Sequence, residues 1–159
     1  MSYTTTYRLF KTKVTTIREH RNSWGSAPVV WDYLEHHYLP PMPYSRAITG
    51  QMKDVWALQR DTRLRACERF ALLATFDWSY CPVDRLMDGA VLLEEFAQLS
   101  EPWAPDRANH WRAIAEDYRS AAIKPDYRLL GICIGCTSVS DPWEYWKPSD
   151  GDPWPIGGN

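Results

Sequence analysis

The stretch Leu129-Leu-Gly-Ile-Cys-Ile-Gly-Cys136, near the C-terminal end of the chain, decides how this sequence is expected to fold. Large apolar residues alternate in it with glycine and cysteine, and the turn-forming pair Pro125-Asp126 precedes it. Alternation with a period of two is typical of a β-strand that has two distinct faces. We therefore predict a strand over Leu129–Val139, with one face made by Leu130, Ile132, Ile134 and Cys136 and the other by Gly131, Cys133 and Gly135.

A second strand is predicted at the other end of the chain, over Tyr3–Phe10, because this segment is rich in threonine and tyrosine and alternates loosely. The two terminal strands are expected to pair. A two-stranded sheet is marginally stable in water, so helices must cover it or further strands must join it.

The segments between these strands have helical spacing. Thr16 and Glu19 match a capping box, which predicts a short helix that ends at Gly25. Further helices are predicted from Ser26 to the prolines after Tyr38, over Thr49–Gln59, and after the starting residues Asp61, Pro82 and either Pro105 or Asp106. The segment Phe70–Phe76 is apolar nearly all round, which indicates a central buried helix.

These elements predict a mainly helical α+β fold of about five or six helices, with a small sheet formed by the strands near the two termini. Residues 1–139 are expected to form a single globular domain, which suits the chain length of 159 residues. The predicted core consists of Leu64, Cys67, Phe70, Ala71, Leu72, Leu73, Phe76, Leu86, Ile114, Ile132 and Ile134.

Residues 140–159 have a different composition from the rest of the chain. Prolines and glycines recur throughout this segment, so we predict no regular structure in it. It also contains three of the nine tryptophans, Trp143, Trp146 and Trp154, which sets it apart from an ordinary disordered tail. Trp143 and Trp146 are expected to pack against the last strand, whereas Trp154 is expected to be free for a partner.

Charge and cysteine content limit the functional class. Residues 1–69 carry a net charge of +5 and residues 70–159 carry −7, and neither block is dense enough for a nucleic-acid-binding stripe. There is no membrane-length apolar run and no signal peptide, so we expect a cytoplasmic protein with reduced thiols. The pair Cys133 and Cys136 lies on a predicted strand, where residues three apart point to opposite faces, so no metal or cofactor is predicted there.

The densest set of potential ligands lies between residues 32 and 37. On a helix, Asp32 and His36 stand four residues apart and both could reach one cation. Two ligands do not complete a metal site, and the order His-Glu-x-x-His is absent. We therefore predict no metal, with Asp32 and His36 as the weak candidates.

Two functional hypotheses follow from these observations. The first is a non-enzymatic protein-binding module, an accessory or inhibitory protein that acts on a larger complex, such as a phage-encoded inhibitor of a host defence system of the CRISPR kind, acting in the host cytoplasm. Its partner-binding residues would be Trp143, Trp146, Trp154, Arg8, Arg18 and Arg21, since tryptophan and arginine are enriched in interfaces. The alternative is a small enzyme or ligand-binding domain with a Trp/His-lined pocket centred on Asp32 and His36.

Overall fold

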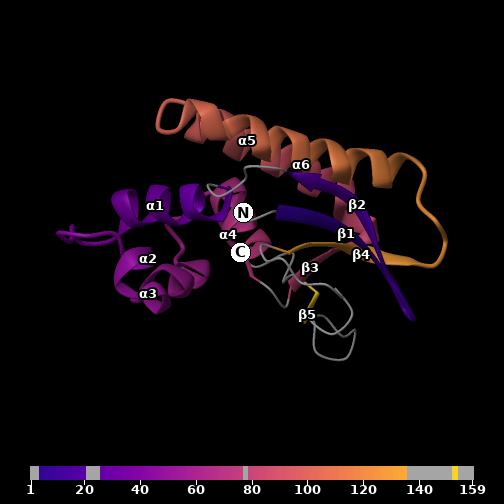
Figure 1. Ribbon diagram of the computed structural model, residues 1–159, viewed down its shortest axis with the longest axis horizontal. Coiled ribbons are helices and arrows are strands. Elements are labelled where there is room, and N and C mark those ends of the chain that lie inside the picture. Colours follow the sequence, from indigo (N-terminus) through magenta and orange to yellow (C-terminus); the bar gives the residue numbers. More distant parts are fainter. Residues whose placement is uncertain (1–3, 21–25, 77–78, 136–151, 154–159) are drawn as a thin grey trace.

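The computed structural model describes residues 4–20, 26–76, 79–135 and 152–153. In these residues the chain forms an α+β domain in which six α-helices accompany one small sheet. Figure 1 shows the sheet at one end of the molecule, two long helices running along it, and a group of short helices at the other end. The predicted fold class is confirmed.

The sheet has the strand order β2-β1-β4-β3-β5. Its strands are β1 (Thr4–Phe10), β2 (Val14–His20), β3 (Ser79–Pro82), β4 (Leu129–Gly135) and β5 (Asp152–Pro153). The first four pair in antiparallel fashion, whereas β5 runs parallel to β3. The predicted pairing of the two terminal strands is therefore present, and it occupies the centre of the sheet.

The predicted faces of β4 are correct for most of the strand. Ile132 and Ile134 belong to the main core, and Cys133 packs against Tyr7 on the opposite face. Leu130 is an exception, because it packs with Cys133 and not with the isoleucines. The register shifts between β1 and β4 at this point, and such a bulge reverses the alternation of side chains beyond it.

The helix predicted from Thr16 towards Gly25 is wrong. Residues 14–20 form β2, which is joined to β1 by a tight turn in which the Phe10 N–H donates to the carbonyl of Lys13 at 2.9 Å. The β-branched residues Thr15, Thr16 and Ile17 favour a strand, and pairing with β1 outweighs the local capping signal. The part of this prediction that falls on residues 21–25 lies outside the described residues.

The other predicted helices are present with adjusted ends. They are α1 (Ser26–Tyr38), α3 (Met52–Ala57), α4 (Ala66–Ala74), α5 (Leu86–Ser100) and α6 (Pro105–Ile123). The segment predicted as one helix over Thr49–Gln59 divides into the end of α2 (Arg46–Thr49), α3 and a 3-10 turn over Leu58–Arg60. A second 3-10 turn, over Val83–Arg85, precedes α5, and β3 was not predicted.

The main core lies between the helices and one face of the sheet. It joins α1, α4, α5 and α6 to β4. Every predicted core residue is buried except Phe76, which is half-buried just after the end of α4. The opposite face of the sheet has a small apolar cluster of its own, made by Tyr7, Leu9 and Cys133.

The C-terminal segment was predicted to contain no regular structure. Asp152 and Pro153 nevertheless pair with Ser79 and Tyr80 as the short strand β5, so the prediction is wrong for these two residues. The rest of residues 140–159 lies outside the described residues. Among the described helices, none combines the length and the apolar character needed to cross a membrane.

Gly131 marks the closest approach of two strands, and we expect Gly131→Ala to be strongly destabilising. A Cβ atom at this position would overlap the backbone carbonyl oxygen of Cys81 on β3 and would lie 2.7 Å from the Tyr80 ring. Since backbone cannot move aside as a side chain can, we expect a loss of about 3 kcal/mol in the free energy of unfolding, the upper end for overpacking. Urea denaturation measures it.

Gly135→Ala is the matched control on the same strand. There the nearest atoms to an added Cβ belong to the ring of Tyr7, the closest at 2.8 Å, and a side chain can shift by a few tenths of an ångström where backbone cannot. We expect the Gly135 variant to lose clearly less stability than the Gly131 variant. Equal losses would mean that β3 does not pack against Gly131 as described.

Candidate functional site

A pocket of about 320 Å³ opens between α1 and the turn that connects α5 to α6. Asp32 on α1 and Trp103 in the turn form two of its walls. The remaining lining comes from Val29, Ala104, Pro105, Asp106 and Arg107. This volume is at the lower end for ligand pockets, so it suits one protruding side chain or a small molecule.

The backbone of the turn fixes the position of Trp103. The N–H groups of Trp103 and Ala104 both donate to the carbonyl of Ser100, at 3.0 and 2.8 Å. Pro105 then begins α6, where a proline is favoured because its fixed φ suits the first turn. These contacts fix the backbone of Trp103 in the turn, and its side chain is 44% exposed there.

Aromatic side chains of α1 support the indole of Trp103 from one side. The rings of His36 and Trp103 have centroids 4.5 Å apart, and the ring of His37 lies 6.0 Å from the same indole. His37 in turn stacks on Tyr33 at 4.1 Å, and its Nδ1 lies 2.7 Å from the carbonyl oxygen of Tyr33. Because a carbonyl can only accept, this contact assigns the proton to Nδ1. The exposed tryptophan is thus held by a layer of packed rings.

Asp32 and His36, the two candidates for a pocket or a cation site, are both next to Trp103 but do not share one ligand position. Asp32 lines the pocket and accepts a hydrogen bond from the Ser45 hydroxyl at 3.0 Å. His36 packs on the indole and is not part of the lining. In the described ranges no three His, Cys, Asp or Glu side chains lie close enough to hold a metal ion.

The residues predicted to bind a partner are only partly described. Arg8 is half-buried on β1, and Arg18 lies on β2 with its side chain 49% exposed. One guanidinium nitrogen of Arg18 is 3.0 Å from a carboxylate oxygen of Asp117 on α6. Arg21 and the three tail tryptophans, Trp143, Trp146 and Trp154, lie outside the described residues, and their role stays a prediction.

Asp117 is the centre of a buried polar cluster that sequence reasoning missed. Its carboxylate is 1% exposed and accepts a hydrogen bond from the Thr6 hydroxyl at 2.7 Å. His20 Nε2 lies 2.9 Å from the same oxygen. Thr6, Arg18 and His20 can all reach Asp117 because the pairing of β1 with β2 places them on one face of the sheet. The cluster fastens α6 to the N-terminal hairpin.

The described cysteines are buried free thiols: Cys67, Cys81 and Cys133. Burial raises the pKa of each thiol, and that of Cys133 reaches about 12. They are therefore protonated at neutral pH, a state in which a thiol is a poor nucleophile and a poor metal ligand. Cys136, the second cysteine of the predicted pair, lies outside the described residues.

Comparisons with known proteins add no relative for this chain. No protein family matches it, and neither the curated proteins nor the solved structures contain a significant match. The function must therefore be argued from the site itself.

The sequence contained a signal for Trp103 in the proline that follows it. Pro105 was expected to begin a helix, so residues just before it had to form a turn. Because segments that connect helices generally run over the surface, this turn made Trp103 a candidate for an exposed side chain. The sequence also indicated that Asp117 is buried, because it lies three residues after Ile114 and one before Tyr118, on the apolar stripe of its helix.

Proposed function

We propose that this protein is a protein-binding module, an accessory or inhibitory protein that acts on a larger complex, and that its contact surface is centred on Trp103. The supporting observation is an exposed tryptophan held by packed rings at the edge of a small acidic pocket. Tryptophan is enriched among the residues that dominate binding energy in interfaces, above all where a neighbouring pocket can take a partner side chain.

Further apolar side chains are exposed at the same end of the molecule. Tyr44, Ile48 and Trp56 belong to the α2–α3 region, which lies below α1 in Figure 1, and Trp103 belongs to the α5–α6 turn above it. Together they are half of the eight large hydrophobic side chains that are exposed among the described residues. Such a concentration at one end is what a protein-contact surface requires.

A buried arginine holds this end of the molecule together. Arg46 on α2 is 5% exposed and contacts Glu35 on α1 through both its guanidinium, at 2.8 Å, and its backbone N–H. Its Nε lies 3.7 Å from Asp54 on α3. Because the short helices are fixed before binding, a partner would not have to order them, and this saves conformational entropy on association.

The proposal keeps the functional class that the sequence predicted. An inhibitor of a host defence system of the CRISPR kind, acting in the host cytoplasm, is one form that such a module takes. The tail tryptophans Trp143, Trp146 and Trp154 would add contacts beyond those of Trp103.

Trp103→Ala tests the proposal. A partner is first captured from the native host with the wild-type protein, identified by mass spectrometry and purified. We expect Trp103→Ala to weaken its affinity by about 30-fold, since truncation of a central anchor commonly costs about 2 kcal/mol. Isothermal titration calorimetry measures the affinity.

Met87→Ala is the matched control, because Met87 is also 44% exposed but lies at the start of α5, at the opposite end of this helix from the turn that holds Trp103. We expect it to change the affinity by less than about threefold, since it lies outside the proposed contact surface. If both variants bind like the wild type, the contact surface lies elsewhere and the proposal fails.

A second candidate function rests on the pocket alone. A site with a carboxylate, an indole and apolar lining also suits a small ligand, as the alternative of a ligand-binding domain or a small enzyme predicts. Ligand-observed NMR with a fragment collection distinguishes the two. Fragments that bind the wild type and lose binding on Asp32→Asn would favour the small-molecule function.

A further inference from the structure

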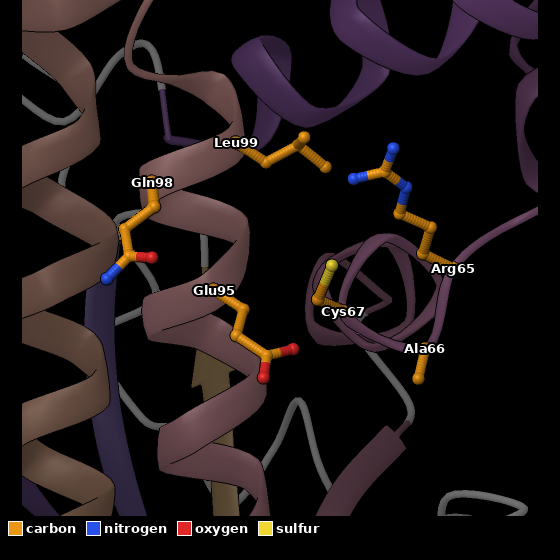
Figure 2. A pocket seen from close by; sticks show the side chains of 6 residues that line it. All are labelled: Arg65, Ala66, Cys67, Glu95, Gln98 and Leu99. Atoms are coloured by element: carbon orange, nitrogen blue, oxygen red, sulfur yellow. The ribbon is translucent and has the colours of Figure 1, made fainter.

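A second hollow, of about 410 Å³, lies between the start of α4 and one side of α5, and it shares no lining residue with the pocket beside Trp103. Figure 2 shows its lining, which comes from Arg65, Ala66 and Cys67 on the α4 side and from Glu95, Gln98 and Leu99 on α5. We call it the α4–α5 groove. Its two walls come from different helices, so the sequence alone could not indicate it.

The groove has opposite charges at its two ends. In Figure 2 the guanidinium of Arg65 extends toward Leu99 at one end, and the carboxylate of Glu95 lies at the other, with the sulfur of Cys67 between them. Within the part of the chain that is described, neither charged side chain has an ion-pair partner, and they do not pair with each other. By contrast, the residue just before Glu95 is paired: Glu94 lies 2.6 Å from the guanidinium of Arg119 on α6.

Both charged groups, Arg65 and Glu95, lie close enough to Cys67 to change the pKa of its thiol, which agrees with their placement around one hollow. Burial is the main cause that raises its pKa, and the carboxylates of Glu68 and Glu95 raise it further, whereas Arg65 lowers it. Glu68 is not available to a ligand, because it is 2% exposed and accepts hydrogen bonds from the Tyr38 hydroxyl and the Arg65 N–H. Glu95 is therefore the free carboxylate of the groove.

We propose that the α4–α5 groove binds a small dipolar ligand whose carboxylate and ammonium group are separated by a short apolar chain. The carboxylate would pair with the guanidinium of Arg65, which can donate two parallel hydrogen bonds to it, and the ammonium group with Glu95. The apolar chain would lie against Leu99 and Cys67 between them. This site is independent of the proposed contact surface around Trp103, and either can fail without the other.

A chain-length series tests the proposal with defined probes. Glycine, γ-aminobutyrate and ε-aminocaproate carry the same two charges at increasing separation, while caproate and hexylamine each carry one of them. Titration into the ¹⁵N-labelled protein, followed by heteronuclear NMR, should shift the amide signals of residues 65–67 and 95–99. We expect the longer dipolar probes to bind at least about fivefold more tightly than glycine and than either single-charge probe, because a second surface charge pair contributes up to about that factor.

Two variants test which residue binds each charged end of the ligand. Arg65→Gln and Glu95→Gln should each weaken binding of the best dipolar probe to the level of a single-charge probe. The control variants are Arg60→Gln and Glu19→Gln, which remove exposed charges outside the groove and should leave the affinity unchanged. Unchanged spectra of the unliganded variants outside the groove show that they fold. The proposal is overturned if no probe shifts these signals at about 20 mM, a concentration that reveals even very weak sites. It is also overturned if caproate binds as tightly as ε-aminocaproate.

Discussion

Trp111→Ala is expected to lower the free energy of unfolding by about 3–5 kcal/mol, the range for deleting a large buried aromatic side chain. Trp111 is 1% exposed at the centre of α6, and its ring meets that of Phe96 edge-on, with centroids 5.8 Å apart. Its indole N–H donates to the carbonyl of Ser26 at 3.0 Å, which joins α6 to the start of α1. Chemical denaturation followed by circular dichroism measures the loss.

Trp111→Phe separates the contribution of ring packing in the core from that of the hydrogen bond to Ser26. It keeps an aromatic ring in the core but leaves the buried carbonyl of Ser26 without this donor, which costs about 1–3 kcal/mol. The exposed Trp56 provides a surface reference, and Trp56→Ala should cost less than about 1 kcal/mol. A Trp111→Ala variant as stable as the Trp56 variant would place α6 outside the core and contradict the fold.

Asp117→Ala is expected to lower the free energy of unfolding by about 3–5 kcal/mol, because the Thr6 hydroxyl and the His20 ring, both buried, each lose their contact with this carboxylate. The hydroxyl of Thr6 and the ring of His20 would both remain buried after the change. Thermal denaturation of the purified variant at neutral pH measures the effect. Loss of this cluster should loosen the N-terminal hairpin from α6.

Arg18→Ala is the control, since it removes only the half-exposed member of the same cluster. Water can replace the arginine, and exposed ion pairs contribute at most about 1 kcal/mol. The Asp117 variant should therefore lose several times more stability than the Arg18 variant. The reverse order would mean that the attraction between Arg18 and Asp117, and not burial of the carboxylate, holds β2 to α6.

The sequence predicted the parts of the fold that are governed by patterns within a single segment. The alternation in β4 and the proline at the start of α6 each identified an element correctly. Errors arose where pairing between segments decides the outcome. Val14–His20 forms a strand because β1 lies beside it, and Leu130 turns to the second face because a bulge shifts the register of β1 and β4.

The candidate site could be predicted only in part for the same reason. The helical spacing of Asp32 and His36 correctly places them on one helix, α1. The contact of His36 with Trp103 and the pocket beside Asp32 depend on how α1 packs near the α5–α6 turn, far away in the sequence. The α4–α5 groove likewise requires two helices to lie side by side, and no local pattern contains that information.

Hydrogen–deuterium exchange of the protein bound to its captured partner is the most direct test of the Trp103-centred surface. We expect slower exchange in the complex over residues 29–36 and 100–107, which surround the pocket, and unchanged exchange in the central strands β1 and β4. Protection confined to the edge strand β2, with no change around Trp103, would contradict it.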